Sequence, residues 1–127
     1  MGTPVIYASS STALAVCELI VHKGLVPYDH VVVQFDLPES LLVEDVDAHT
    51  VSSAWPYDSS ISATKDFGTE WVKSLRTPVL KVPSAVIRPE HNYLLNPSHP
   101  DYPQITYKIL ENTLDARLHN LAKLIRP

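Results

Sequence analysis

Proline constrains the backbone of this chain more than any other residue type, because 11 of its 127 residues are prolines and only three are glycines. Each proline fixes the φ angle and removes a backbone donor, so the connections between elements should be stiff. Five of the prolines fall in one stretch, KVPSAVIRPEHNYLLNPSHPDYP at residues 81–103, where Ser84 also stands in an apolar run. This stretch predicts a strand that ends or bulges near Pro83, a turn at Pro89 and a second strand with a rigid exit loop.

Length and composition predict one soluble domain over residues 1–127, since 45 % of the residues are hydrophobic and 19 % are charged. The net charge of −4 argues against direct binding of nucleic acid, which usually needs a basic surface. No segment approaches the roughly 20 apolar residues of a membrane span, so we expect no membrane contact. The single cysteine, Cys17, fits a reducing compartment such as the cytoplasm and most simply a small buried thiol.

The periodicity predicts an α+β fold with a mixed, mostly antiparallel sheet and flanking helices. Two helices are expected, the first ended by Gly24. They cover residues 12–24 and 63–76. The strands cover residues 4–9, 29–38, 77–87 and 91–97, with a weaker extended segment at 41–48. Residues 48–63 read as a loop, residues 105–112 as a strand or the start of a helix, and residues 115–127 as a short helix or an irregular tail.

A glutamate in the first predicted helix departs from its apolar surroundings. At about 100° per residue, Leu14 and Val21 project near Glu18, while Val16 and Ile20 project from the far side. A helix that is apolar all round is buried, and a buried carboxylate must be paired, hydrogen-bonded or protonated. Glu18 is therefore either a structural, hydrogen-bonded residue or a carboxylate that lines a cleft.

Ser84 is a similar exception in its strand. Strict alternation places Leu80, Val82, Ser84 and Val86 on one face, where the hydroxyl is the single polar group. The simpler interpretation is a serine bonded to neighbouring backbone, and the alternative is a site residue. The six histidines and the cysteine show no metal-ligand spacing, so we assign no metal site.

Five segments carry a resemblance to a known family: PVIYAS, ALAVCELIVH, GTEWV, LKVPSAVIRPEHNYLLNPSHPDYP and LDARL. Together they resemble the RES domain, the toxin half of a bacterial toxin–antitoxin pair, over nearly the whole chain from Thr3 to Leu118. The resemblance implies a fold similar to diphtheria-toxin-type ADP-ribosyltransferases, NAD as a substrate with no resident cofactor, a cognate Xre-type antitoxin as partner, and a toxin dimer within that complex.

The resemblance also implies roles for three residues. By motif, the family's glutamate falls on Glu18 and its serine on Ser84, which would be the catalytic pair, and Tyr7 matches an aromatic residue that would stack on nicotinamide. Glu18 would stabilise the positive charge that develops on the ribose, and Ser84 would orient the ribose or the carboxamide. The implied activity is NAD breakdown by hydrolysis or phosphorolysis; the alternatives are protein ADP-ribosylation and an inactive binding module.

One family residue has no counterpart here. The family carries an arginine about ten residues before the tyrosine, commonly as R-W-N, whereas only six residues precede Tyr7. The four arginines of the chain, Arg76, Arg88, Arg117 and Arg126, do not match that position. We therefore expect a RES domain shortened by its first strand, with weakened binding of the NAD pyrophosphate.

Overall fold

The computed structural model describes residues 4–24, 30–46, 62–87 and 89–111. Within them the strands are β1 (Ile6–Ser9), β2 (Val32–Asp36), β3 (Val43–Asp45), β4 (Val79–Pro83), β5 (His91–Leu95) and β6 (Thr106–Leu110). The helices are α1 (Thr12–Lys23), α3 (Ser62–Ser74) and the 3₁₀ turn η1 (Tyr102–Gln104). Predictions for residues 48–61 and 115–127 lie outside the described residues.

Two sheets organise these elements. The larger sheet has the order β1-β5-β4-β3, in which β5 pairs antiparallel with both β1 and β4, and β3 pairs parallel with β4. In the second sheet β2 pairs antiparallel with β6 along five residues of each strand, so the ambiguous segment 105–112 contains a strand over Thr106–Leu110. The predicted α+β class with a mixed, mostly antiparallel sheet is confirmed.

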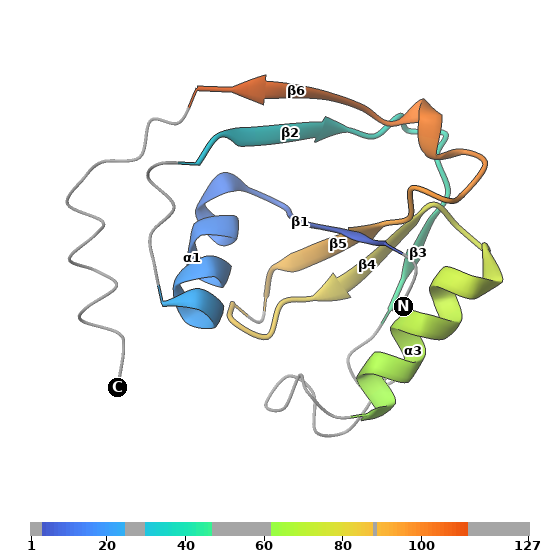
Figure 1. Ribbon diagram of the computed structural model, residues 1–127, viewed down its shortest axis with the longest axis horizontal. Helices are drawn as coiled ribbons and strands as arrows, with labels where there is room; N and C mark the ends of the chain where they lie inside the picture. The colour runs from blue at the N-terminus through green and yellow to red at the C-terminus, as the bar shows by residue number, and fades with distance from the viewer. Residues whose placement is uncertain (1–3, 25–29, 47–61, 88, 112–127) are drawn as a thin grey trace.

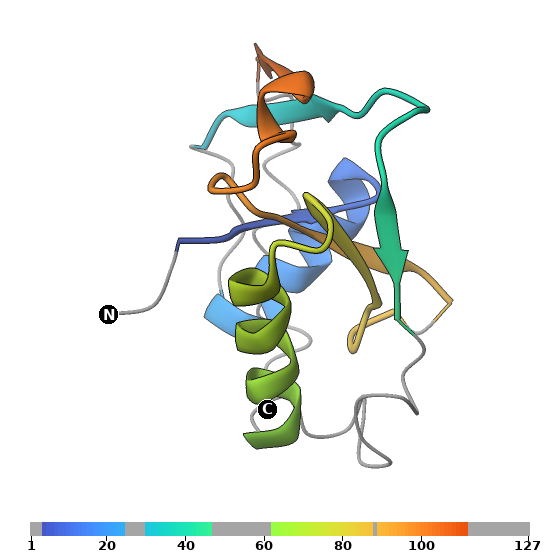
Figure 2. The same ribbon diagram turned by 90° about the vertical axis from the view of Figure 1, so that its right-hand side faces the viewer.

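The larger sheet lies between two layers (Figures 1 and 2). Strands β2 and β6 lie over one face, α3 lies on the other side, and α1 lies beside the sheet at the end away from α3. The core on the β2–β6 side consists of Leu41, Val79, Leu95 and Ile105, with Phe35 and Leu37 packed against it. The core on the α3 side consists of Val46, Trp71, Val72, Leu80 and Val82. Strand β4 therefore supplies apolar side chains to both cores, Val79 to one and Leu80 and Val82 to the other.

Helix α1 begins and ends as its sequence predicts. The Ser11 hydroxyl accepts a hydrogen bond from the Leu14 N–H at 3.1 Å, and Gly24 follows with a φ of 68° in the left-handed region. Its buried residues are Leu14, Val16, Glu18 and Ile20. The helix is not buried on all sides, since Val21 is 57 % exposed. Glu18 is nevertheless buried, because it lies on the side that faces the sheet.

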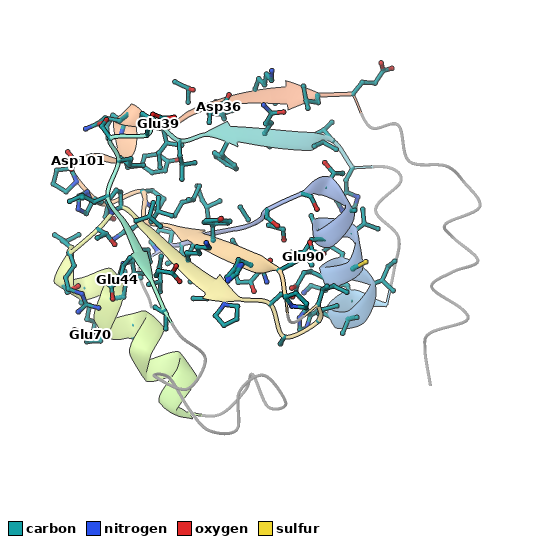
Figure 3. The ribbon with its side chains drawn as sticks, turned by 180° about the vertical axis from the view of Figure 1, so that it is seen from behind. Asp36, Glu39, Glu44, Glu70, Glu90 and Asp101 are labelled. Carbon is teal, nitrogen blue, oxygen red and sulfur yellow. The ribbon has the colours of Figure 1, made fainter. Side chains whose placement is uncertain are left out.

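Helix α3 is held to the sheet by the buried indole of Trp71 and by the ion pairs of Arg76 with two glutamates. Trp71 is fully buried, and its indole N–H donates to the Thr77 hydroxyl at 2.9 Å. Arg76 donates to both carboxylate oxygens of Glu44 on β3 and to Glu70 on α3, and these bonds raise its pKa. Figure 3 shows the two glutamates on the same side of the molecule.

Neither described helix is long and apolar enough to cross a bilayer.

Candidate active site

A buried carboxylate lies where α1 meets the larger sheet. Glu18 is 6 % exposed, and its Oε2 accepts two hydrogen bonds. One comes from the Ser84 hydroxyl at 2.8 Å and the other from the Asn92 Nδ2 at 2.6 Å. Glu18 and Ser84, the two predicted catalytic residues, are therefore in direct contact although 66 positions separate them.

The direction of the Ser84 hydroxyl is determined by its surroundings. Ser84 is fully buried directly after β4, and its oxygen accepts from the backbone N–H groups of Val86 at 3.1 Å and Ile87 at 3.0 Å. Since a hydroxyl has one hydrogen and two lone pairs, both lone pairs are used and the hydrogen must point to Glu18. The backbone of the turn that follows β4 thus fixes the Ser84 hydroxyl as a donor to Glu18.

Asn92 is a site residue that the sequence analysis missed. It lies on β5 and is 1 % exposed, and both the nitrogen and the oxygen of its side-chain amide form hydrogen bonds. Its Nδ2 donates to Glu18 and to the Tyr7 hydroxyl oxygen at 2.9 Å, while its Oδ1 accepts from the Ser9 hydroxyl at 2.8 Å. A signal for it was available: alternation from Leu94 places Asn92 on an inward-facing position of β5.

Tyr7 lies at the outer end of this network. The residue is 58 % exposed, but its hydroxyl is packed against Asn92. Desolvation of the hydroxyl and the charge of Glu18 raise the pKa of Tyr7 to about 12, against the lowering effect of the Asn92 hydrogen bond. Tyr7 therefore presents a neutral phenol and a largely open ring. It reaches Glu18 through Asn92, without a direct hydrogen bond.

The second oxygen of Glu18 faces a more open environment. Its Oε1 lies 3.2 Å from His22 Nε2, one turn further along α1, and the His22 side chain is 51 % exposed. Oε2 is thus bonded by two donors of the protein, whereas Oε1 contacts only His22 among the residues that the structure describes, and solvent reaches the His22 side chain. Among the described residues no group of three His, Cys, Asp or Glu side chains could hold a metal ion.

This geometry favours charge stabilisation as the chemistry of the site. A carboxylate that is held by donors on one oxygen keeps its orientation and can direct its other oxygen at a developing positive charge. A partly exposed aromatic ring beside it offers a face for stacking.

The comparisons with known proteins agree on one family. A sequence model of the RES domain matches residues 1–119. The chain is 34 % identical over 105 residues to the Prs ADP-ribosylating toxin of a Sphingobium species, a match that covers 80 % of this chain and 65 % of the relative. It is 33 % identical over 122 residues to the Toxin Res of Photorhabdus laumondii, covering 93 % and 78 % of the two chains. This chain therefore belongs to the RES domain family.

Proposed function

We propose that this protein is a toxin that consumes NAD by breaking the bond between nicotinamide and ribose. The observation that carries the proposal is the buried Glu18 carboxylate, which Ser84 and Asn92 hold beside the open ring of Tyr7. The names of its relatives, Toxin Res and Prs ADP-ribosylating toxin, support both the toxin role and chemistry on ADP-ribose.

The reaction would use Glu18 as an electrostatic stabiliser. Departure of nicotinamide leaves an oxocarbenium-like ribose, and a carboxylate next to that ring lowers the energy of the positive charge. Oε1 would serve this purpose, since Oε2 accepts from two buried donors, Ser84 and Asn92, whereas the His22 side chain beside Oε1 is half exposed and can give way to a ligand. Tyr7 would stack on the nicotinamide ring. NAD enters this scheme as a substrate that is used up.

The acceptor of the ADP-ribosyl group distinguishes two candidate functions. Water or inorganic phosphate as acceptor gives NAD breakdown, which we place first. Transfer to a protein is the second candidate, because the relative from Sphingobium is named an ADP-ribosylating toxin. In either case we propose that a cognate antitoxin of the Xre type holds the toxin inactive and that two toxin chains associate in that complex.

The test is the release of nicotinamide from NAD that carries a label in its adenine half. Purified protein is incubated with labelled NAD, with and without inorganic phosphate, and nicotinamide is quantified by chromatography. The label then appears in ADP-ribose, in a phosphorylated ADP-ribose or on protein, which identifies the acceptor. Glu18→Gln keeps the shape of the side chain and removes its charge, so it should lower the rate by roughly 100-fold or more.

Two results would contradict the proposal. Folded protein that releases no nicotinamide at high concentration would favour an inactive binding module that retains only its antitoxin partner. Full activity of Glu18→Gln would show that the carboxylate does not act on the reaction, even if NAD is consumed.

A further inference from the structure

We infer that Asn92 is a positioning residue that holds Glu18 and Tyr7 as one unit and directs the phenol hydrogen of Tyr7 toward an oxygen of the ligand. The inference rests on the proposed function, since it concerns the same site. It adds a second task for Tyr7, which becomes a hydrogen-bond donor as well as a stacking surface.

The first step is the orientation of the Asn92 amide. Its amino group faces Glu18 Oε2 at 2.6 Å, and its oxygen faces the Ser9 hydroxyl at 2.8 Å. A flipped amide would place an oxygen against the carboxylate oxygen, which is repulsive. Ser9 lies directly opposite Asn92 in the β1–β5 register, so the strand pairing itself supplies the donor that anchors the amide oxygen.

The second step is the hydrogen of Tyr7. Its oxygen accepts from Asn92 Nδ2 at 2.9 Å, so the O–H hydrogen is not used in that bond. Among the described residues no side chain or backbone group accepts this hydrogen. Because the residue is 58 % exposed and its pKa is raised to about 12, the phenol keeps its hydrogen at neutral pH and can offer it outward.

The third step is the ligand group that takes this hydrogen bond. The acceptor must be an oxygen within reach of the Tyr7 hydroxyl when Glu18 faces the ribose. NAD offers two classes of such oxygen, the nicotinamide carboxamide and the oxygens of ADP-ribose. Binding of nicotinamide and of ADP-ribose, each alone, to wild type and to Tyr7→Phe separates them, because the variant should weaken only the half that supplies the acceptor.

Asn92→Asp is the informative perturbation of the amide. The variant keeps the shape of the side chain but places an oxygen 2.6 Å from Glu18 Oε2 and 2.9 Å from the Tyr7 oxygen. The two carboxylates repel each other, and the new oxygen accepts the Tyr7 hydrogen and turns it inward. Both effects act on the reaction, while the packing of β5 is preserved.

Asn96→Asp is the matched control. Asn96 is also fully buried, but its Nδ2 donates to the Val72 carbonyl at 3.2 Å and its Oδ1 accepts from the Ser98 N–H at 3.0 Å. These hydrogen bonds join the residues that follow β5 to α3, and none of them involves Glu18, Tyr7 or Ser84. Asn96→Asp should therefore lower the free energy of unfolding but leave KM, and kcat corrected for the folded fraction, unchanged.

The experiment measures kcat and KM for NAD consumption, corrected for the folded fraction by circular dichroism. Tyr7→Phe should raise KM about tenfold with kcat changed less than about twofold, which is the loss of about one hydrogen bond. Asn92→Asp should lower kcat by about 100-fold. If Asn92→Asp does not fold, Asn92→Ala provides the same test, with a smaller decrease in kcat because it introduces no repulsion.

Failure of the inference differs from failure of the proposed function. Wild-type kcat and KM in both Asn92 variants, or an equal decrease in Asn96→Asp, would overturn the positioning role. Unchanged binding of both nicotinamide and ADP-ribose by Tyr7→Phe would overturn the donor role, whether or not NAD is consumed. Inactive wild type or fully active Glu18→Gln would instead overturn the proposed function.

Discussion

Ser84→Ala should cost this protein about 3 kcal/mol of folding free energy. The variant removes a hydrogen bond to the Glu18 carboxylate, and such bonds to charged groups contribute about 1.5–3 kcal/mol. It also leaves the N–H groups of Val86 and Ile87 without their acceptor. Both are only partly buried, so water replaces part of each bond and the added cost is about 0.5–1 kcal/mol in total. The alanine methyl group fills most of the space, which keeps the cavity cost small.

The assay is urea denaturation, with Ser74→Ala as the control. Ser74 also has a hydroxyl that donates and accepts, to the Trp71 carbonyl and from the Arg76 N–H, but it is exposed. Its loss should cost less than about 1 kcal/mol, because water replaces both partners. An equal shift of the urea midpoint in the two variants would refute the argument that burial and the carboxylate make the Ser84 hydroxyl valuable.

Three further predictions concern stability. Leu75 follows α3 with a φ of 55°, in the left-handed region that glycine adopts without strain. Leu75→Gly should therefore raise the unfolding temperature, with a net gain of about 0.5–1 kcal/mol in the free energy of unfolding. A lower unfolding temperature would argue against strain at this position. Trp71→Phe should cost about 2–4 kcal/mol in urea denaturation, because the fully buried indole fills the core and donates to Thr77, and a cost below about 1 kcal/mol would contradict that account. The folded pKa of Tyr7, about 12, exceeds its unfolded value of about 10, so the unfolded chain loses this proton first and stability falls as pH rises from about 10 to about 12. Tyr7→Phe should reduce that fall in alkaline denaturation, whereas the same pH dependence in both proteins would show that Tyr7 does not contribute to it.

Much of the secondary structure was predictable because its signals are local. The end of α1 at Gly24 follows from side-chain chemistry within a few residues. The strand predicted over 77–87 is shorter in the structure, since β4 ends at Pro83 and a turn begins at Ser84. The segment 105–112 stayed ambiguous because its apolar residues suit either period. Pairing with β2, which lies 70 or more positions earlier in the chain, decides that this segment forms the strand β6.

The site was predictable only in part. Glu18 and Ser84 stand out as polar exceptions in apolar elements, yet periodicity alone left a structural role open for each. The resemblance to the RES domain assigned them a site, and the structure brings them to 2.8 Å of each other. Asn92 was missed although alternation placed it on the inward face of the predicted strand 91–97, because that position does not specify which groups the amide meets. Its importance comes from three partners, on β1 and α1, that lie 74 or more positions away.

The sequence by itself therefore determined which elements form and which of their residues are chemically out of place, because capping, proline geometry and alternation act over a few residues. The tertiary structure alone decided which of these residues meet. The β1–β5 register places Ser9 opposite Asn92, and the packing of α1 on that sheet brings Glu18 to both Asn92 and Ser84. Strand register and helix docking depend on the whole core, so no local pattern could specify the network that joins Tyr7 to Glu18.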